Sequence, residues 1–257
     1  TVLFFCLFRV DGQQTDISAV SDIPKVTSVK KFENGQLLSE SRYFYNLQGD
    51  ITQERTVYFD SDKGVQDNNN MRDMKTCTYK NDNITMTHDR LNPGKSEFVN
   101  MYTSYFKVNG KGLVTEKYYS FAGKYKFLYK YDSSDYRIYE KFLSYGSDTL
   151  NEYLEHYNYY AYIYSESCVI KEYVVSDDPN MDKQIEYTYF KDRVNTIGNE
   201  NFGQGFLGAS GRHPVSKQIS SNHNGTYEQT YTYEYENGRI IKKMTNTTVF
   251  VYTYSLD

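Results

Sequence analysis

The chain has 257 residues, a formal charge of −4 at neutral pH and a sequence pI near 5.7. Its lysines and arginines are spread evenly, whereas nucleic-acid binding needs a basic face that neutralises phosphates, so this partner class is excluded. The length suits one large β domain. We expect a single repeat-built domain over 13–257, with a subdivision near 145–150 as the alternative, and the oligomeric state stays open.

Tyrosine dominates the composition. The chain has 29 Tyr and 15 Phe but no Trp, and its mean hydropathy of −0.74 is low for a packed protein. A tyrosine ring buries like a hydrophobic group while its hydroxyl stays hydrated or hydrogen-bonded, so tyrosine can cover sheet faces where aliphatic residues are few. Disordered segments lack aromatic residues, and the composition therefore predicts a folded chain.

The first residues form an apolar run over 1–8 that is too short to cross a bilayer. The small side chains of Val10 and Gly12 suit cleavage by a signal peptidase before Gln13. We therefore expect residues 1–12 to be the remnant of an export signal, with a buried first strand as the alternative. No other stretch is apolar and long enough to be a transmembrane segment.

The three cysteines lie far apart and form no Cys-x-x-Cys pair, which excludes a disulfide framework and a zinc site. Cys77 and Cys168 alternate with apolar residues and are interpreted as small strand residues. Cys6 follows bulky Phe5, although lipid attachment sites prefer small neighbours; whether the chain is lipid-anchored stays open. The four histidines are isolated and are interpreted as surface or turn residues: His88, His156, His213 and His223.

Period-two alternation, broken by turn residues, runs along most of the chain. It predicts an all-β fold of repeated antiparallel hairpins in one extended or rolled sheet, with few or no helices. One hairpin joins 125–131 to 136–142. Asn-Gly pairs between alternating runs predict type I′ turns, which need two residues at positive φ. These pairs are Asn34-Gly35, Asn109-Gly110 and Asn237-Gly238.

Four stretches interrupt the alternation. Residues 60–74 and 88–96 are predicted to be polar loops, and 195–214 is rich in glycine. Within 148–157 the apolar residues stand at helical spacing behind an aspartate that suits an N-cap, so a short helix stays open there.

The sequence offers weak signals for chemistry. The segment 208–211 approaches the Gly-x-Ser-x-Gly nucleophile elbow, but it is one residue short and lies in a β context, so we expect Ser210 to cap a turn. The acidic segments 60–64 and 177–182 depart from the calcium-loop pattern and are interpreted as solvated loops. We predict no catalytic residue, no cofactor and no metal, hence no enzyme; a hydrolase is the least favoured alternative.

Three segments follow one another along the chain and carry a family resemblance: 187–189, 205–214 and 231–242. They resemble a family of secreted or lipid-anchored Bacteroidetes proteins with a C-terminal domain of unknown function. Its members pair a Gly-x-Ala-Ser-x-x-x-Pro segment with a final Tyr-rich hairpin; Gly211 and His213 depart from its usual residues. The hairpins also resemble the YD repeats of Rhs-type shell proteins. The resemblance implies export from a Gram-negative cell, to the periplasm, the outer-membrane surface or the medium, and implies no activity.

One strand carries the feature with functional content, because its tyrosines populate both faces: Tyr157, Tyr159, Tyr160, Tyr162 and Tyr164. The pleat should bury one parity and leave the other partly exposed. Exposed rows suit stacking on sugars or gripping a protein, whereas cross-strand ladders are the structural alternative. We expect a non-catalytic exported binding or scaffold protein of the cell envelope or surface, with a glycan or another surface protein as partner. The alternative is a shell or protein-interaction module like the Rhs repeats.

Overall fold

The computed structural model describes residues 23–59, 71–120, 124–147, 152–203 and 205–255. Its regular structure is strand, apart from two short 3-10 turns, η1 (Pro179–Met181) and η2 (Glu200–Phe202). The all-β prediction is therefore confirmed. The strands are β1 (Val26–Glu33), β2 (Gln36–Tyr45), β3 (Ile51–Tyr58), β4 (Arg72–Lys80), β5 (Asn83–Leu91), β6 (Val99–Val108), β7 (Val114–Tyr119), β8 (Lys124–Tyr131), β9 (Arg137–Ser147), β10 (Glu152–Ser165), β11 (Cys168–Ser176), β12 (Lys183–Tyr189), β13 (Val215–Asn222), β14 (Gly225–Thr230), β15 (Thr232–Glu236), β16 (Arg239–Met244) and β17 (Thr248–Tyr254).

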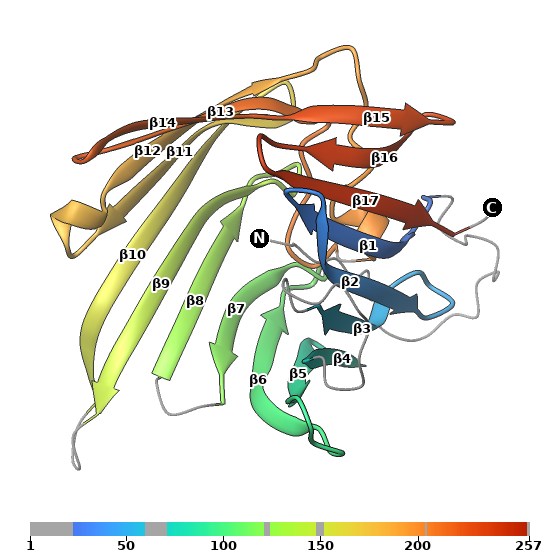
Figure 1. Cartoon of the computed structure of the whole chain (residues 1–257). Helices are drawn as coiled ribbons and strands as arrows, with labels where there is room; N and C mark the ends of the chain where they lie inside the picture. Colours follow the sequence, from blue (N-terminus) through green and yellow to red (C-terminus); the bar gives the residue numbers. More distant parts are fainter. Residues whose placement is uncertain (1–22, 60–70, 121–123, 148–151, 204, 256–257) are drawn as a thin grey trace.

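The strands form one antiparallel sheet that curls into a nearly closed roll (Figure 1). Consecutive strands pair from β1 to β14 and from β15 to β17, and β1 also pairs with β17. At Tyr231 the chain passes from β14, which pairs with β13, to β15, which pairs with β16. No helix in the described part of the chain is long and apolar enough to cross a bilayer.

Two of the three predicted Asn-Gly turns have the expected backbone. Asn34 and Gly35 have φ of 49° and 83°, and Asn237 and Gly238 have φ of 49° and 76°. Positive φ at both central positions is the requirement of a type I′ turn, whose twist matches that of the flanking strands. The hairpin from 125–131 to 136–142 is also present, as β8 and β9.

The prediction of a type I′ turn at Asn109-Gly110 was wrong, although the chain does turn there. The side-chain Oδ1 of Asn109 accepts the backbone N–H groups of Lys111 and Leu113, at 2.9 and 3.0 Å. This closes a longer turn in which Gly112, with φ of 79°, takes the left-handed position. Asparagine side chains compete in this way with the backbone for turn hydrogen bonds.

Strand pairing also moved several predicted boundaries. β4 begins at Arg72 and β5 continues to Leu91, so the predicted loops 60–74 and 88–96 are shorter than expected. The short helix considered for 148–157 is replaced from Glu152 onward by β10, because its backbone pairs with β9. Residues 1–22, 60–70 and 148–151 lie outside the described residues, and with them the predicted export signal and the first acidic segment.

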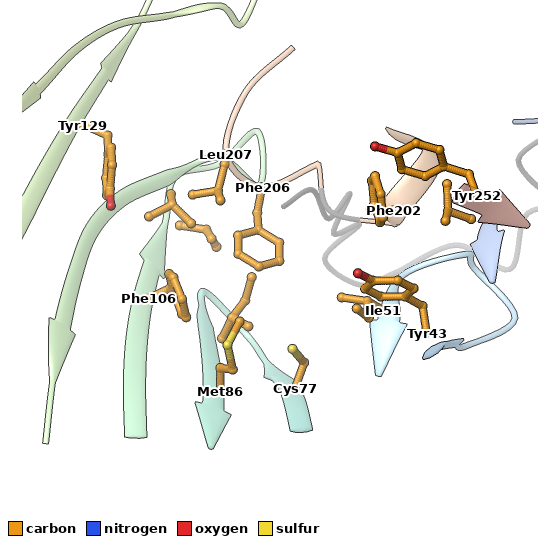
Figure 2. Close-up of a cluster of buried hydrophobic side chains, with 14 of the residues drawn as sticks. Tyr43, Ile51, Cys77, Met86, Phe106, Tyr129, Phe202, Phe206, Leu207 and Tyr252 are labelled. Atoms are coloured by element: carbon orange, nitrogen blue, oxygen red, sulfur yellow. The ribbon is translucent and has the colours of Figure 1, made fainter. Parts of the chain in front are cut away.

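The core lies inside the roll. Buried apolar side chains from ten strands form one cluster with Phe202, Phe206 and Leu207, which come from the glycine-rich stretch 195–214, here called the inner segment. Figure 2 shows these side chains together with core residues of several strands. Tyr43 packs edge-on against Phe202, with ring centroids 5.2 Å apart, and Phe106 packs against Phe206 at 5.4 Å. These ten strands are β1–β8, β16 and β17, which make up most of the roll, and they can share one cluster only on its enclosed side.

The inner segment is tied to one end of the roll by its backbone. Gly203 and Phe206 accept hydrogen bonds at their carbonyls from Ile51 N–H and Val114 N–H, at 3.1 and 2.6 Å. Ala209 donates its N–H to the carbonyl of Asp135 at 2.8 Å. These partners stand at alternate hairpin turns, which in an antiparallel meander all lie at the same end of the sheet. The inner segment therefore closes that end.

Gly208 of the inner segment yields a first prediction. It has φ of +100°, and a Cβ there would lie 2.7 Å from a ring carbon of Tyr131 and 2.8 Å from the carbonyl oxygen of Asp135. Gly208→Ala should lower the free energy of unfolding by about 2 kcal/mol or more, because strain and overlap add. Gly225→Ala is the control: φ is +132° but nothing lies within 4 Å, so about 1 kcal/mol is expected. Equal losses in urea unfolding would contradict the close packing.

Candidate functional site

β10 positions the predicted tyrosines, and its pleat separates them into two sets. Residues paired across an antiparallel ladder face the same side of the sheet. Tyr160 pairs with Glu140, which pairs with the core residue Tyr129, so Tyr160 faces the enclosed side. Tyr162 and Tyr164 share its parity, whereas Tyr157 and Tyr159 face outward. The two parities therefore face opposite sides of the sheet, but all five side chains are half-buried, so the expected burial of one parity was wrong.

The outward tyrosines belong to a larger aromatic group. Tyr159 lies 5.0 Å from Tyr157 and 6.0 Å from Tyr139 of β9, measured between ring centroids. Tyr139 pairs with Ala161, which also pairs with Tyr173 of β11, so Tyr173 faces the same side. We call these four side chains the outer tyrosine patch: Tyr139, Tyr157, Tyr159 and Tyr173.

The strand register places one small side chain, Ala161, within the outer tyrosine patch. Ala161 is exposed and stands directly between Tyr139 and Tyr173 on the neighbouring strands. Directly opposed Cβ atoms are about 5 Å apart, so the two tyrosines are about 10 Å apart across the alanine. The small side chain of Ala161 therefore separates two large rings on the neighbouring strands.

Lysines stand over three rings of this patch. The Nζ atoms of Lys141, Lys130 and Lys171 lie 4.7, 5.2 and 5.7 Å from the ring centroids of Tyr159, Tyr139 and Tyr173 respectively. Such exposed cation–π contacts contribute roughly 0.5–1 kcal/mol each. They are weak enough for a ligand to displace, and they place ammonium donors beside the aromatic surface.

The enclosed tyrosines of β10 are engaged in structural contacts. The Tyr164 hydroxyl donates to the carbonyl of Arg137 at 2.8 Å, and the Arg137 guanidinium lies 5.1 Å from the Tyr162 ring centroid. Burial raises the pKa of Tyr160, and it raises the pKa of Tyr164 to about 12. These three tyrosines therefore behave as the cross-strand ladder that sequence analysis kept as the alternative.

Charged side chains line the same enclosed side. The Arg137 guanidinium lies 2.8 Å from the Glu140 carboxylate, and burial raises the pKa of that carboxyl. Lys117 of β7 has its Nζ 4.6 Å from the Tyr119 ring centroid and 5.2 Å from that of Phe127. Burial lowers the pKa of Lys117 to about 8, because an ammonium among aromatic rings is poorly solvated.

A second polar group includes one of the isolated histidines. His88 of β5 is buried, so its prediction as a surface or turn residue was wrong; it shares the parity of the core residues Ile84 and Met86. Its Nε2 lies 3.0 Å from Asp73, which also accepts two hydrogen bonds from Arg90, at 2.8 and 3.0 Å. Burial acts to raise the Asp73 pKa, but these partners hold it below its usual value.

The remaining chemical candidates have structural partners. The Ser210 hydroxyl oxygen accepts the backbone N–H of Asn199 at 2.6 Å, so Ser210 caps a turn as expected. Asp178 accepts from the backbone and side-chain amides of Asn180, both at 2.9 Å, and Asp182 accepts the Ser176 N–H at 2.7 Å. Within the described ranges no three metal-ligating side chains gather. Cys77 and Cys168 are buried free thiols, which confirms their interpretation as small strand residues.

Solved structures with a similar fold come from Bacteroides. A porin-like protein from Bacteroides uniformis is 14% identical, covers 90% of this chain and 98% of its own, and superposes with a TM-score of 0.61. One from Bacteroides vulgatus is 13% identical, with 90% and 99% coverage and a TM-score of 0.53. The likeness is one of fold. No family model and no curated protein matches the chain.

Sequence reasoning found β10 but missed its partners in the outer tyrosine patch. Tyr139 and Tyr173 stand on β9 and β11, each within the same period-two alternation. Their position beside Ala161 depends on the pairing register, which is set by bulges between Leu154 and His156 and between Ile163 and Tyr164. A register that includes bulges cannot be derived from alternation alone.

The lowered Lys117 pKa predicts a pH dependence. Below about pH 8 the lysine is charged in both states, and the folded state carries the cost of burial. Between pH 8 and the ordinary value of 10.5, unfolded Lys117 holds more protons, so stability rises with pH. Relative to Lys117→Met, the wild type should gain about 2 kcal/mol between pH 7 and 9.5 in urea unfolding. Parallel pH profiles would contradict a buried ammonium.

Proposed function

We propose that the protein is a non-catalytic component of the envelope or surface of a Gram-negative cell, and that it binds glycan at the outer tyrosine patch. The observation that carries the proposal is the outward row in which Tyr139, Ala161 and Tyr173 stand side by side. Export and a Bacteroidetes source are supported by the sequence resemblance and by the Bacteroides origin of the similar folds.

The chemistry of the patch fits a sugar. Tyrosine presents a large rigid surface whose ordering costs little entropy, and its hydroxyl adds a hydrogen bond. A pyranose ring has apolar C–H faces that stack on such rings, and the exposed, small side chain of Ala161 lets a sugar approach Tyr139 and Tyr173 together. Lys130, Lys141 and Lys171 then supply donors to sugar hydroxyl or carboxylate oxygens.

The rest of the outward face supports contact with water. Cross-strand ion pairs with short N–O distances occur on it from β7 round to β16: Lys126–Glu116 (2.8 Å), Lys171–Glu186 (2.8 Å), Lys217–Glu228 (2.6 Å) and Lys242–Glu234 (2.7 Å). A transmembrane barrel instead presents an apolar band to lipid, where each lysine or arginine at the midplane costs about 2–4 kcal/mol. The proposed protein therefore belongs to an aqueous compartment of the envelope or to the cell surface.

The glycan proposal is tested by the double variant Tyr139→Ala/Tyr159→Ala on an array that includes neutral and uronic-acid polysaccharides. Binding should be lost, whereas the melting temperature should change by only a few degrees because both side chains are outward. The control is Tyr105→Ala/Tyr118→Ala, which removes a stacked outward pair on β6 and β7 with centroids 4.9 Å apart.

The control variant should keep the array profile of the wild type. An unchanged profile in the Tyr139/Tyr159 variant would overturn the proposed site. If the wild type binds no glycan, the alternative of a shell or protein-interaction module is favoured. Unfolding of the double variant would instead identify the outer tyrosine patch as a ladder that the sheet needs.

A separate prediction concerns the bilayer. Protein comprising 23–257 should stay monodisperse in size-exclusion chromatography without detergent, and it should remain at the bottom of a sucrose gradient with phosphatidylethanolamine–phosphatidylglycerol vesicles. The outward ion pairs provide the physical reason. Flotation with the vesicles, or aggregation that detergent reverses, would contradict a water-facing exterior.

A further inference from the structure

A groove of about 520 Å³ crosses the outward face of β2, β3 and β4, away from the outer tyrosine patch. Its volume lies in the range of small-molecule sites. Three arginines contribute to its lining, one from each strand: Arg42, Arg55 and Arg72. The wall also includes Glu40, Thr56 and Asp73, and the Asp73 carboxylate is held by His88 and Arg90. Apolar side chains make up the remainder: Phe44, Val57, Phe59, Met74 and Phe98.

The positions of the arginines destabilise the sheet. Arg42 and Arg55 are directly opposite each other in the β2–β3 register, and like charges in that position destabilise a sheet. Arg72 is opposite Val57 on the other side of β3. Three guanidinium groups therefore gather over three neighbouring strands.

Acidic side chains do not fully neutralise the three arginines of the groove. Glu40 lies 3.0 Å from Arg42 but also 3.9 Å from Lys30, so one carboxylate serves two cations. Arg55 donates to the Gln53 amide oxygen and lies over the Phe44 ring at 4.9 Å, and neither group is charged. The Arg72 Nε is buried and has no hydrogen-bond partner among the residues described. A buried donor without a partner typically costs 1–3 kcal/mol.

The apolar side chains define the other half of an occupant. Phe44 and Phe98 are 41% and 43% exposed, which is high for phenylalanine, and they flank the groove with Val57 and Met74. An inorganic anion would satisfy the arginines and leave these rings in water. An uncharged apolar molecule would cover the rings and leave the arginines without an acceptor.

We infer that this groove binds a small amphipathic carboxylate, with its oxygens on Arg55 and Arg72 and its apolar body against Phe44 and Phe98. The guanidinium fork matches a carboxylate in a bidentate geometry. The ligand would give the Arg72 Nε the acceptor that it lacks, and its negative charge would offset the repulsion between Arg42 and Arg55. This site is independent of the glycan proposal.

Isothermal titration of the protein with octanoate, 1-octanol and acetate tests the inference. Octanoate should bind at least tenfold more tightly than either of the others, because only octanoate offers both the charge and the chain. Arg72→Met and Arg55→Met should each weaken octanoate binding at least tenfold. The matched control is Lys217→Met, which removes an outward cation of β13 that pairs with Glu228, and it should bind like the wild type.

Octanoate affinity no higher than that of acetate or 1-octanol would overturn the inference, as would wild-type affinity in both arginine variants. If Lys217→Met weakens octanoate binding as much as the arginine variants do, the effect is one of net charge, and the inference is overturned as well. Circular dichroism checks that each variant is folded. If Arg55→Met unfolds, Arg55→Gln takes its place. The Tyr139→Ala/Tyr159→Ala protein should retain octanoate binding, so that failure of the glycan proposal leaves this result standing.

Discussion

The structure depends on filling the space that a closed sheet encloses. Protein interiors are packed as densely as organic crystals, and a roll that is too wide for its own side chains needs another element inside. Here the inner segment supplies Phe202, Phe206 and Leu207 to a cluster with buried residues of β1–β8, β16 and β17. Its carbonyls at Gly203 and Phe206 also accept strand N–H groups, so the segment is buried without losing backbone hydrogen bonds.

Tyrosine explains how so polar a chain fills the remaining interior. Several hydroxyls donate to backbone carbonyls where strands bend or end: Tyr79 to Ile51 (2.6 Å), Tyr233 to Val215 (2.9 Å), Tyr164 to Arg137 (2.8 Å) and Tyr254 to Ile240 (2.8 Å). Each ring therefore contributes apolar area while its hydroxyl stays satisfied. The low mean hydropathy reflects this use of amphipathic rings, because the hydropathy scale counts tyrosine as polar whatever its partner is.

Local signals predicted the local structure. Alternation predicted β8 and β9, and Asn-Gly pairs predicted two turns, because both patterns act between near neighbours. The closure of β1 on β17 joins residues more than 200 positions apart, and no short pattern encodes it. The inner segment was recognised only as a break in the alternation, since its packing inside the roll depends on strands that it does not adjoin.

The candidate site shows the same division. Parity correctly separated Tyr157 and Tyr159 from Tyr160, but it could not say which set faces outward, because that depends on the direction in which the sheet curls. His88 was misjudged although it shares the parity of Ile84 and Met86, since an isolated histidine was weighed by type and not by position. The sequence could not single out Arg72, because what distinguishes it is a buried Nε without a hydrogen-bond partner.

The change of partner at Tyr231 has a mechanical consequence. β14 is held by β13 and β15 by β16, and Tyr231 joins the two halves through its N–H to Ser216 at 2.9 Å. Elsewhere among the described strands, neighbours are joined by ladders of at least three residue pairs, whereas here the chain itself and a few hydrogen bonds to β13 make the connection. The continuity of the roll at this point therefore depends on Tyr231 and Tyr233, whose hydroxyls hydrogen-bond to Gln218 and to the carbonyl of Val215.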